Sequence, residues 1–65
     1  MLETIGINAG KVWSILDESG NQSIKELRKA SELVYYDLYA ALGWLARENK
    51  IVLENKNDEL YIKLA

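Results

Sequence analysis

Three residue types that build many functional sites are missing from this 65-residue chain: cysteine, histidine and proline. Without cysteine the chain can form neither a disulfide framework nor a thiolate metal site. Without histidine it lacks the commonest metal ligand and the commonest general base. We therefore expect no cofactor and no bound metal. Because proline is absent, glycine marks the breaks between the elements.

Long apolar runs and an excess of positive charge are missing as well. No segment approaches the roughly 20 apolar residues of a membrane span, and the first residues lack the basic and apolar regions of a signal peptide. We therefore expect a cytoplasmic protein with no membrane partner. Eight basic and ten acidic residues leave a net charge of -2, which gives no general attraction to nucleic acid.

Apolar residues, by contrast, are plentiful for the length. Residues 1–65 are expected to form a single domain, and domains of this size are marginally stable because they bury a smaller share of their surface. Yet 49% of the residues are hydrophobic, among them two Trp and four Tyr. Either the core is dense or part of the apolar surface binds a partner.

A spacing of three and four between apolar residues predicts a first helix that ends before Gly20. Gly20 suits a left-handed cap at the C-terminus of this helix. As an alternative, Asn8 can be the N-cap, so that the helix starts there. Trp13 lies on the edge of the apolar face, which is formed by Leu2, Ile5, Ala9, Val12 and Leu16.

Gly6 and Gly10 lie one helical turn apart in this segment. In a helix interior each costs up to about 1 kcal/mol relative to Ala. Two interpretations remain open. Either another backbone packs closely against the two glycines, or the first turn is frayed or the helix simply tolerates them.

A capping box predicts the start of the second helix. Ser23 supplies the N-cap and Glu26 the third helical position, and residues 22–24 can add a short strand before them. Leu27 and Ala30 are expected to point inward.

A turn at residues 31–33 is expected next, with Leu33 as the apolar plug between two helices. The third helix is predicted from Tyr35 to Glu48. Its inward side consists of Leu38, Ala41, Leu42 and Leu45, and we expect Leu42 and Leu45 to pack against Leu16 and Leu27. The outward stripe consists of Tyr36, Ala40, Gly43 and Arg47, bordered by Tyr39 and Trp44.

The last segment alternates between apolar and polar residues, which predicts two strands. Ile51 and Leu53 share one face of the first strand, whereas the second strand presents Leu60, Ile62 and Leu64. The polar stretch 54–59 between them favours a turn. The whole pattern predicts an α+β fold with three helices and a C-terminal β-hairpin.

This order of elements resembles the winged helix-turn-helix superfamily, with the hairpin as the wing. The matching core positions are Ser23, Leu27, Leu33, Leu38, Ala41, Leu42, Leu45 and Ile51. Over nearly the whole chain, the sequence also looks like a family of small uncharacterised bacterial winged-helix proteins, a domain of unknown function. The segments that carry this likeness are Ile5-Gly6, Ala9-Gly-Lys-Val-Trp13 and, above all, Leu42-Gly-Trp-Leu-Ala-Arg-Glu48 within residues 41–51. The resemblance implies the fold and a bacterial cytosolic setting and suggests self-association, but it implies no activity.

DNA binding is the first functional hypothesis. In a DNA-binding winged helix the outward stripe of the third helix enters the major groove, where Arg, Lys, Asn or Gln read the bases. Residues 34–46 contain no Lys or Arg. Asp37 would repel phosphates, and the turn position before the helix is the apolar Val34. Phosphate contacts could come from Lys25, Arg28, Lys29, Arg47, Lys50 and Lys56, with Tyr36 at the groove.

Protein association explains the outward stripe better than DNA binding does. Its aromatic residues are of the kind enriched at interface hot spots, and its small residues let another helix approach. Alternatively, Trp44 and Tyr39 fold back as peripheral core. The candidate interface residues are Tyr36, Tyr39, Ala40, Gly43 and Trp44 on the third helix, and Gly6, Ile7, Gly10 and Trp13 on the first. We expect a homodimer, with another protein partner as the alternative.

Catalysis is not expected from this sequence. The adjacent carboxylates at 17–18 and 58–59 fall in predicted turns, and no nucleophile-base pair, phosphate loop or metal-spaced cluster occurs. A domain this small also has little room for a substrate pocket of several hundred cubic ångströms. We therefore predict a non-enzymatic interaction module with no small-molecule substrate, and keep a DNA-binding regulator as the alternative.

Overall fold

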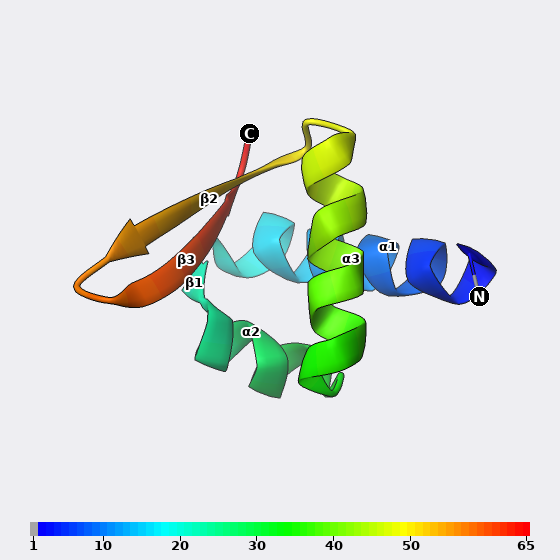
Figure 1. The fold of residues 1–65 in the computed structure, drawn as a ribbon, viewed down its shortest axis with the longest axis horizontal. Helices are drawn as coiled ribbons and strands as arrows, with labels where there is room; N and C mark the ends of the chain where they lie inside the picture. The colour runs from blue at the N-terminus through cyan, green and yellow to red at the C-terminus, as the bar shows by residue number, and fades with distance from the viewer. Residues whose placement is uncertain (1) are drawn as a thin grey trace.

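The computed structural model describes residues 2–65, which form an α+β winged helix as the sequence predicts. The helices are α1 (Leu2–Ser19), α2 (Ile24–Ser31) and α3 (Tyr35–Arg47), and the strands are β1 (Gln22–Ser23), β2 (Ile51–Lys56) and β3 (Glu59–Leu64). The strands of this part of the chain form one antiparallel sheet in the order β1-β3-β2. Helix α3 stands across α1, and the hairpin reaches away from both (Figure 1).

Helix α1 is continuous from Leu2, so the alternative start at Asn8 is wrong. Gly6 and Gly10 consequently lie in the helix interior, and the frayed-turn interpretation does not hold for residues 2–19. Gly20 has a φ of 78°, and its N–H donates to the Leu16 carbonyl at 2.9 Å. The predicted left-handed cap is therefore confirmed. The side chain of Leu2 lies outside the described part of the chain.

Helix α2 starts with the predicted capping box at Ser23 and Glu26. The prediction that Ala30 points inward is wrong, because its side chain is exposed. The inward positions are Ile24, Leu27 and Ser31, which follow one another at steps of three and four. Ala30 lies to one side of that row.

Ser31 is the last residue of α2, and its buried side chain holds the turn to α3. The Ser31 hydroxyl donates to the Arg28 carbonyl and accepts from the Leu33 N–H, each at 3.3 Å. Glu32 then adopts the left-handed conformation with a φ of 60°. Leu33 packs against the core, as expected of an apolar plug.

The hairpin turn is shorter than the predicted six-residue stretch, because β2 continues to Lys56 and β3 begins at Glu59. Asn57 and Asp58 alone form the turn, with φ of 52° and 63°. Two consecutive left-handed residues match the twist of a two-residue hairpin, and Asn and Asp tolerate that conformation. The expected short strand at residues 22–24 is present as β1, which pairs with β3.

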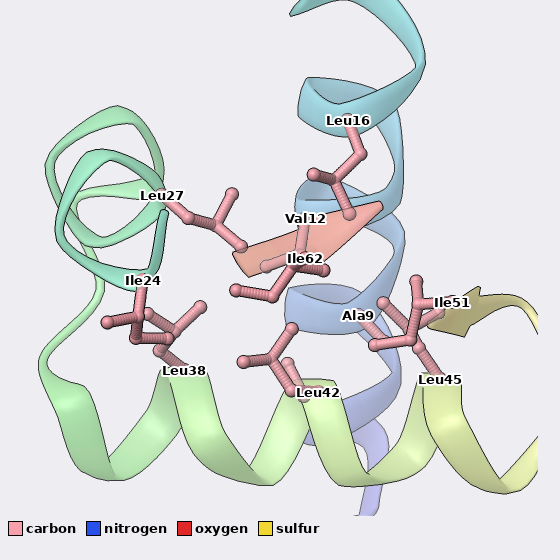
Figure 2. Packing of buried hydrophobic residues seen from close by; sticks show 11 residues of the cluster. Ala9, Val12, Leu16, Ile24, Leu27, Leu38, Leu42, Leu45, Ile51 and Ile62 are labelled. Carbon is pink, nitrogen blue, oxygen red and sulfur yellow. The ribbon is translucent and has the colours of Figure 1, made fainter. Parts of the chain in front are cut away.

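The core lies between the three helices and the inner face of the sheet (Figure 2). The predicted group of Leu16, Leu27, Leu42 and Leu45 is buried in this one cluster, together with Ala9, Val12, Ile24, Leu38, Ala41, Ile51 and Ile62. Leu53 departs from the prediction, since 45% of it is exposed. It shares the face of Ile51 but lies on the edge strand β2. The hairpin that β2 forms with β3 reaches past the helices (Figure 1).

Candidate interaction site

The crossing of α1 and α3 brings together residues that the sequence placed on two separate surfaces. A cleft of about 350 Å³ lies where the two helices meet, and Trp13 and Trp44 both line it. The rest of the lining consists of Gly6, Ala9, Gly10, Leu45 and Lys50. Trp13 and Trp44 are each 37% exposed. Both indoles therefore pack partly against the protein and leave part of their surface open to a partner.

A second cleft, of about 280 Å³, lies between the same two helices, farther toward the start of α3. Thr4, Ile5 and Asn8 line it from α1, and Tyr36, Asp37 and Ala40 line it from α3. Helix α1 thus crosses α3 between Ala40 and Trp44, with one cleft on each side. We call the lining of both clefts, together with the outer side of α1, the α1–α3 face.

Tyr39 does not belong to the α1–α3 face. Its ring stacks on Tyr35, with 6.0 Å between the ring centroids and 26° between the planes. The guanidinium of Arg28 lies 5.8 Å from the centre of the Tyr35 ring, a distance at which a cation is attracted to the aromatic face. The predicted aromatic stripe is therefore divided. Tyr36, Ala40 and Trp44 face α1, whereas Tyr39 is on the side of α2.

Gly43 and Ile7 lie on exposed surface next to this crossing. Gly43 is on the outward side of α3, between the positions of Tyr36 and Arg47 on the helix surface. Ile7 is 72% exposed on the outer side of α1. Within the described residues, a Cβ added at Gly6, Gly10 or Gly43 would meet nothing within 4 Å. These three glycines are therefore not required by packing within the described chain.

The basic residues of the DNA hypothesis are spread over the molecule. Lys25, Arg28 and Lys29 are on α2, and Arg47 is at the far end of α3. Lys50 lines the cleft of the two tryptophans. Lys56 lies by the hairpin turn, where its ammonium is 6.0 Å from the centre of the Tyr61 ring. The fold does not bring these side chains together around the outward stripe of α3.

Two titratable groups are shifted by local hydrogen bonds. The pKa of Glu26 is lowered because the backbone N–H of Ser23, and next its side chain, stabilise the ionised carboxylate. The pKa of Tyr61 is raised because the phenol hydrogen-bonds to the Glu59 carboxylate, whose charge also opposes ionisation. Neither group lines the clefts. Among residues 2–65, no group of three or more Asp and Glu side chains can hold a metal ion. Across the same residues, no helix is long and apolar enough to cross a membrane.

Thr4, Asn8 and Asp37 line the second cleft, a role that the sequence analysis gave to none of them. It considered Asn8 only as an N-cap and Asp37 only as unfavourable for DNA. It also gave no role to Glu3 and Lys11, which are exposed on the outer side of α1 beside Ile7. The available signal was the spacing of four between Glu3, Ile7 and Lys11, which places them on one row of the helix.

Comparison with known proteins agrees with this architecture. Residues 1–64 match the family model described as "Winged helix-turn-helix domain (DUF2582)". The chain is 36% identical over 63 residues to the uncharacterised protein MJ1608 of Methanocaldococcus jannaschii, covering 92% of this chain and 89% of that protein. It is similar to the solution NMR structure of BT2368 from Bacteroides thetaiotaomicron, with a TM-score of 0.87 and 45% identity over 95% of this chain and 76% of that one. Since the first relative is archaeal, the likeness extends beyond the bacterial setting implied by the sequence.

Proposed function

The chain belongs to the DUF2582 family of winged helix-turn-helix domains, and from its surface we propose that it is a non-enzymatic module that associates with a second copy of itself through the α1–α3 face. One observation carries the proposal. Trp13 and Trp44 come from different helices and line the same cleft, together with Gly6 and Gly10. Large aromatic side chains beside open space are typical of interface anchors and the pockets that receive them.

A symmetric dimer requires one surface that is complementary to itself. The α1–α3 face offers both halves of such a contact. Ile7, Trp13 and Trp44 project from it, and the glycine positions and two clefts are recessed. This combination supports a second copy of the chain as the occupant. Another protein partner is the alternative.

DNA binding is a second candidate, supported by the winged-helix fold and by the cations of α2. The outward side of α3 weakens it, because residues 34–46 contain no Lys or Arg and Asp37 is close to the start of the helix. Any DNA affinity would have to come from phosphate contacts by the cations of α2, the end of α3 and the wing, and such contacts carry no sequence information directly. The cytoplasmic location expected from the sequence remains a prediction.

Sedimentation equilibrium across micromolar concentrations tests self-association. We expect the average mass to rise with concentration from that of one 7.4 kDa chain toward twice that value. A mass that stays at one chain across the whole range would refute the proposed function.

A further inference from the structure

The outer side of α1 carries a symmetric row of three exposed side chains. Glu3, Ile7 and Lys11 follow one another at steps of four, and each is exposed. Residues four apart are neighbours on a helix surface, so an acid lies one turn before Ile7 and a base one turn after it. The first turns of α1 project past α3 (Figure 1). This row is therefore open to another molecule.

We infer that two copies of the chain pair through α1 in antiparallel orientation, with the two-fold axis at Ile7. This inference rests on the proposed self-association and names its orientation. It places the centre of the contact on the outer side of α1, which is part of the α1–α3 face, beside the cleft of the two tryptophans and not within it. A two-fold axis at Ile7 places Ile7 against the partner's Ile7. It also places Glu3 opposite the partner's Lys11 and Lys11 opposite the partner's Glu3. Both ends of the row therefore meet an opposite charge.

Charge complementarity selects this orientation over the parallel one. In a parallel pair the acid of one chain would meet the acid of the other, and the base would meet the base, which is destabilising. The antiparallel arrangement replaces both like-charge contacts with ion pairs. Charged rims of this kind set register and orientation more than affinity, while the apolar centre supplies the buried surface.

Gly10 lets the two helices come close at the centre of the row. It lies beside Ile7, one turn along the helix, and in the described structure nothing lies within 4 Å of a Cβ built there. The partner's Ile7 would find no side chain at this position. A close approach to a second helix also gives a reason for a helix-interior glycine that packing within the chain does not supply.

Charge reversal tests the orientation directly. Glu3→Lys alone, or Lys11→Glu alone, converts both end contacts of the dimer into like-charge pairs. We expect each to weaken the homodimer by about tenfold, given the modest energy of exposed ion pairs. An equimolar mixture of the two variants should form a heterodimer of nearly parental affinity, since each end again has one acid and one base. The double variant should also recover the parental affinity.

Recovery of the dimer affinity in the double variant cannot come from a new ion pair within one chain. Positions 3 and 11 are about 12 Å apart along the helix axis at the usual rise per residue, so they do not pair with each other. Matched controls with the same net-charge change are Glu32→Lys at the C-cap of α2 and Lys29→Glu within α2, both at exposed positions that are not on α1. Circular dichroism at low concentration checks that each variant monomer is folded.

The outcomes separate the two proposals. If the parent is monomeric at all concentrations, self-association itself fails. If the parent is dimeric but the single reversals match their controls, the antiparallel α1 contact is wrong while self-association stands. Weakening by either single reversal without recovery in the mixture would also overturn the antiparallel register.

Discussion

Ser23 and Glu26 hold each other at the start of α2 by two reciprocal hydrogen bonds. The N–H of Ser23 donates to Glu26 Oε1 at 2.8 Å, and the N–H of Glu26 donates to Ser23 Oγ at 3.2 Å. Ser23 is also a β1 residue paired with Tyr61 in the register of the sheet. One residue therefore fixes both the start of a helix and the edge of the sheet.

This capping box predicts a dependence of stability on pH. Because the folded-state pKa of Glu26 is lowered, its contribution is full above the unfolded-state pKa and is lost as pH falls through the folded-state value. The parent should therefore lose more stability on acidification than Glu26→Gln, whose amide oxygen can still accept the Ser23 N–H. Thermal melts over a series of acidic pH values measure the difference. Parallel pH curves for the two proteins would contradict the assignment.

Removing the Ser23 hydroxyl should lower stability at neutral pH. Ser23→Ala takes away the acceptor for the Glu26 N–H, and loss of an N-cap costs about 0.5–2 kcal/mol. The pKa of Glu26 should rise toward its ordinary value, since one of the groups that lowers it is gone. Chemical denaturation and an NMR titration of the Glu26 carboxyl measure the two effects. An unchanged pKa of Glu26 in Ser23→Ala would show that the Ser23 hydroxyl does not stabilise the ionised Glu26 carboxylate.

Leu42→Ala should nearly abolish folding. Leu42 is buried in the central cluster, and such truncations cost about 2–5 kcal/mol, a large share of the stability of a small domain. Leu53→Ala is the matched control, because the same atoms are removed at a half-exposed position on β2. A melting temperature for Leu42→Ala only a few degrees below the parent would show that the site is not tightly packed.

Two glycines should respond to alanine in opposite directions. Gly10 is helical with open space around it, so Gly10→Ala should stabilise the isolated chain by up to about 1 kcal/mol. Gly20 has a φ of 78°, and Gly20→Ala should destabilise it because alanine is strained there. Melts at concentrations below dimer formation give both values. Equal shifts for the two variants would rule out this explanation.

The dimer contact should distinguish Gly10 from Gly43. Both are exposed helix-interior positions where a glutamate side chain can be built. Gly10→Glu puts a charge beside Ile7 and should shift the chain to monomer, whereas Gly43→Glu, on the outward side of α3, should leave the dimer affinity close to the parental value. Sedimentation measures both. The reverse result would move the interface to the aromatic stripe of α3.

Duplex DNA should bind weakly at most, without sequence preference and with sensitivity to salt. The outward side of α3 offers Tyr36, Ala40 and Gly43 before it reaches Arg47, and specific readout needs cationic or amide side chains. A shift assay on mixed duplex at low and moderate salt measures this. Submicromolar affinity at moderate salt with a steep salt slope would overturn the prediction.

Local signals explain how far the sequence could be interpreted. Periodicity and the Ser23–Glu26 spacing were sufficient for the helices and most of the core. They failed at Ala30, which lies to one side of the buried row of α2, and at Leu53, whose exposure depends on its place on an edge strand. The length of the Asn57–Asp58 turn was overestimated, because the strand ends on either side of it are as polar as the turn itself.

The sequence predicted the candidate residues on each helix but not how the two helices combine them into one site. Periodicity tells which residues share one side of a helix, but it does not tell where two helices cross. That α1 passes between Ala40 and Trp44, and that Tyr39 turns instead to Tyr35, depends on this crossing. Glycine spacing pointed to α1 and aromatic spacing to α3, and the tertiary structure alone joins them in one face.

The central strand of the sheet is also the last element of the fold in chain order. Both β1 and β2 pair with β3, and Ile62 of β3 is fully buried in the core. A ribosome must therefore release the residues of β3 before either neighbouring strand can find its partner. Until then the nascent chain lacks Ile62 from its core and both strand pairings of its sheet, so its cooperative folding must await the synthesis of β3.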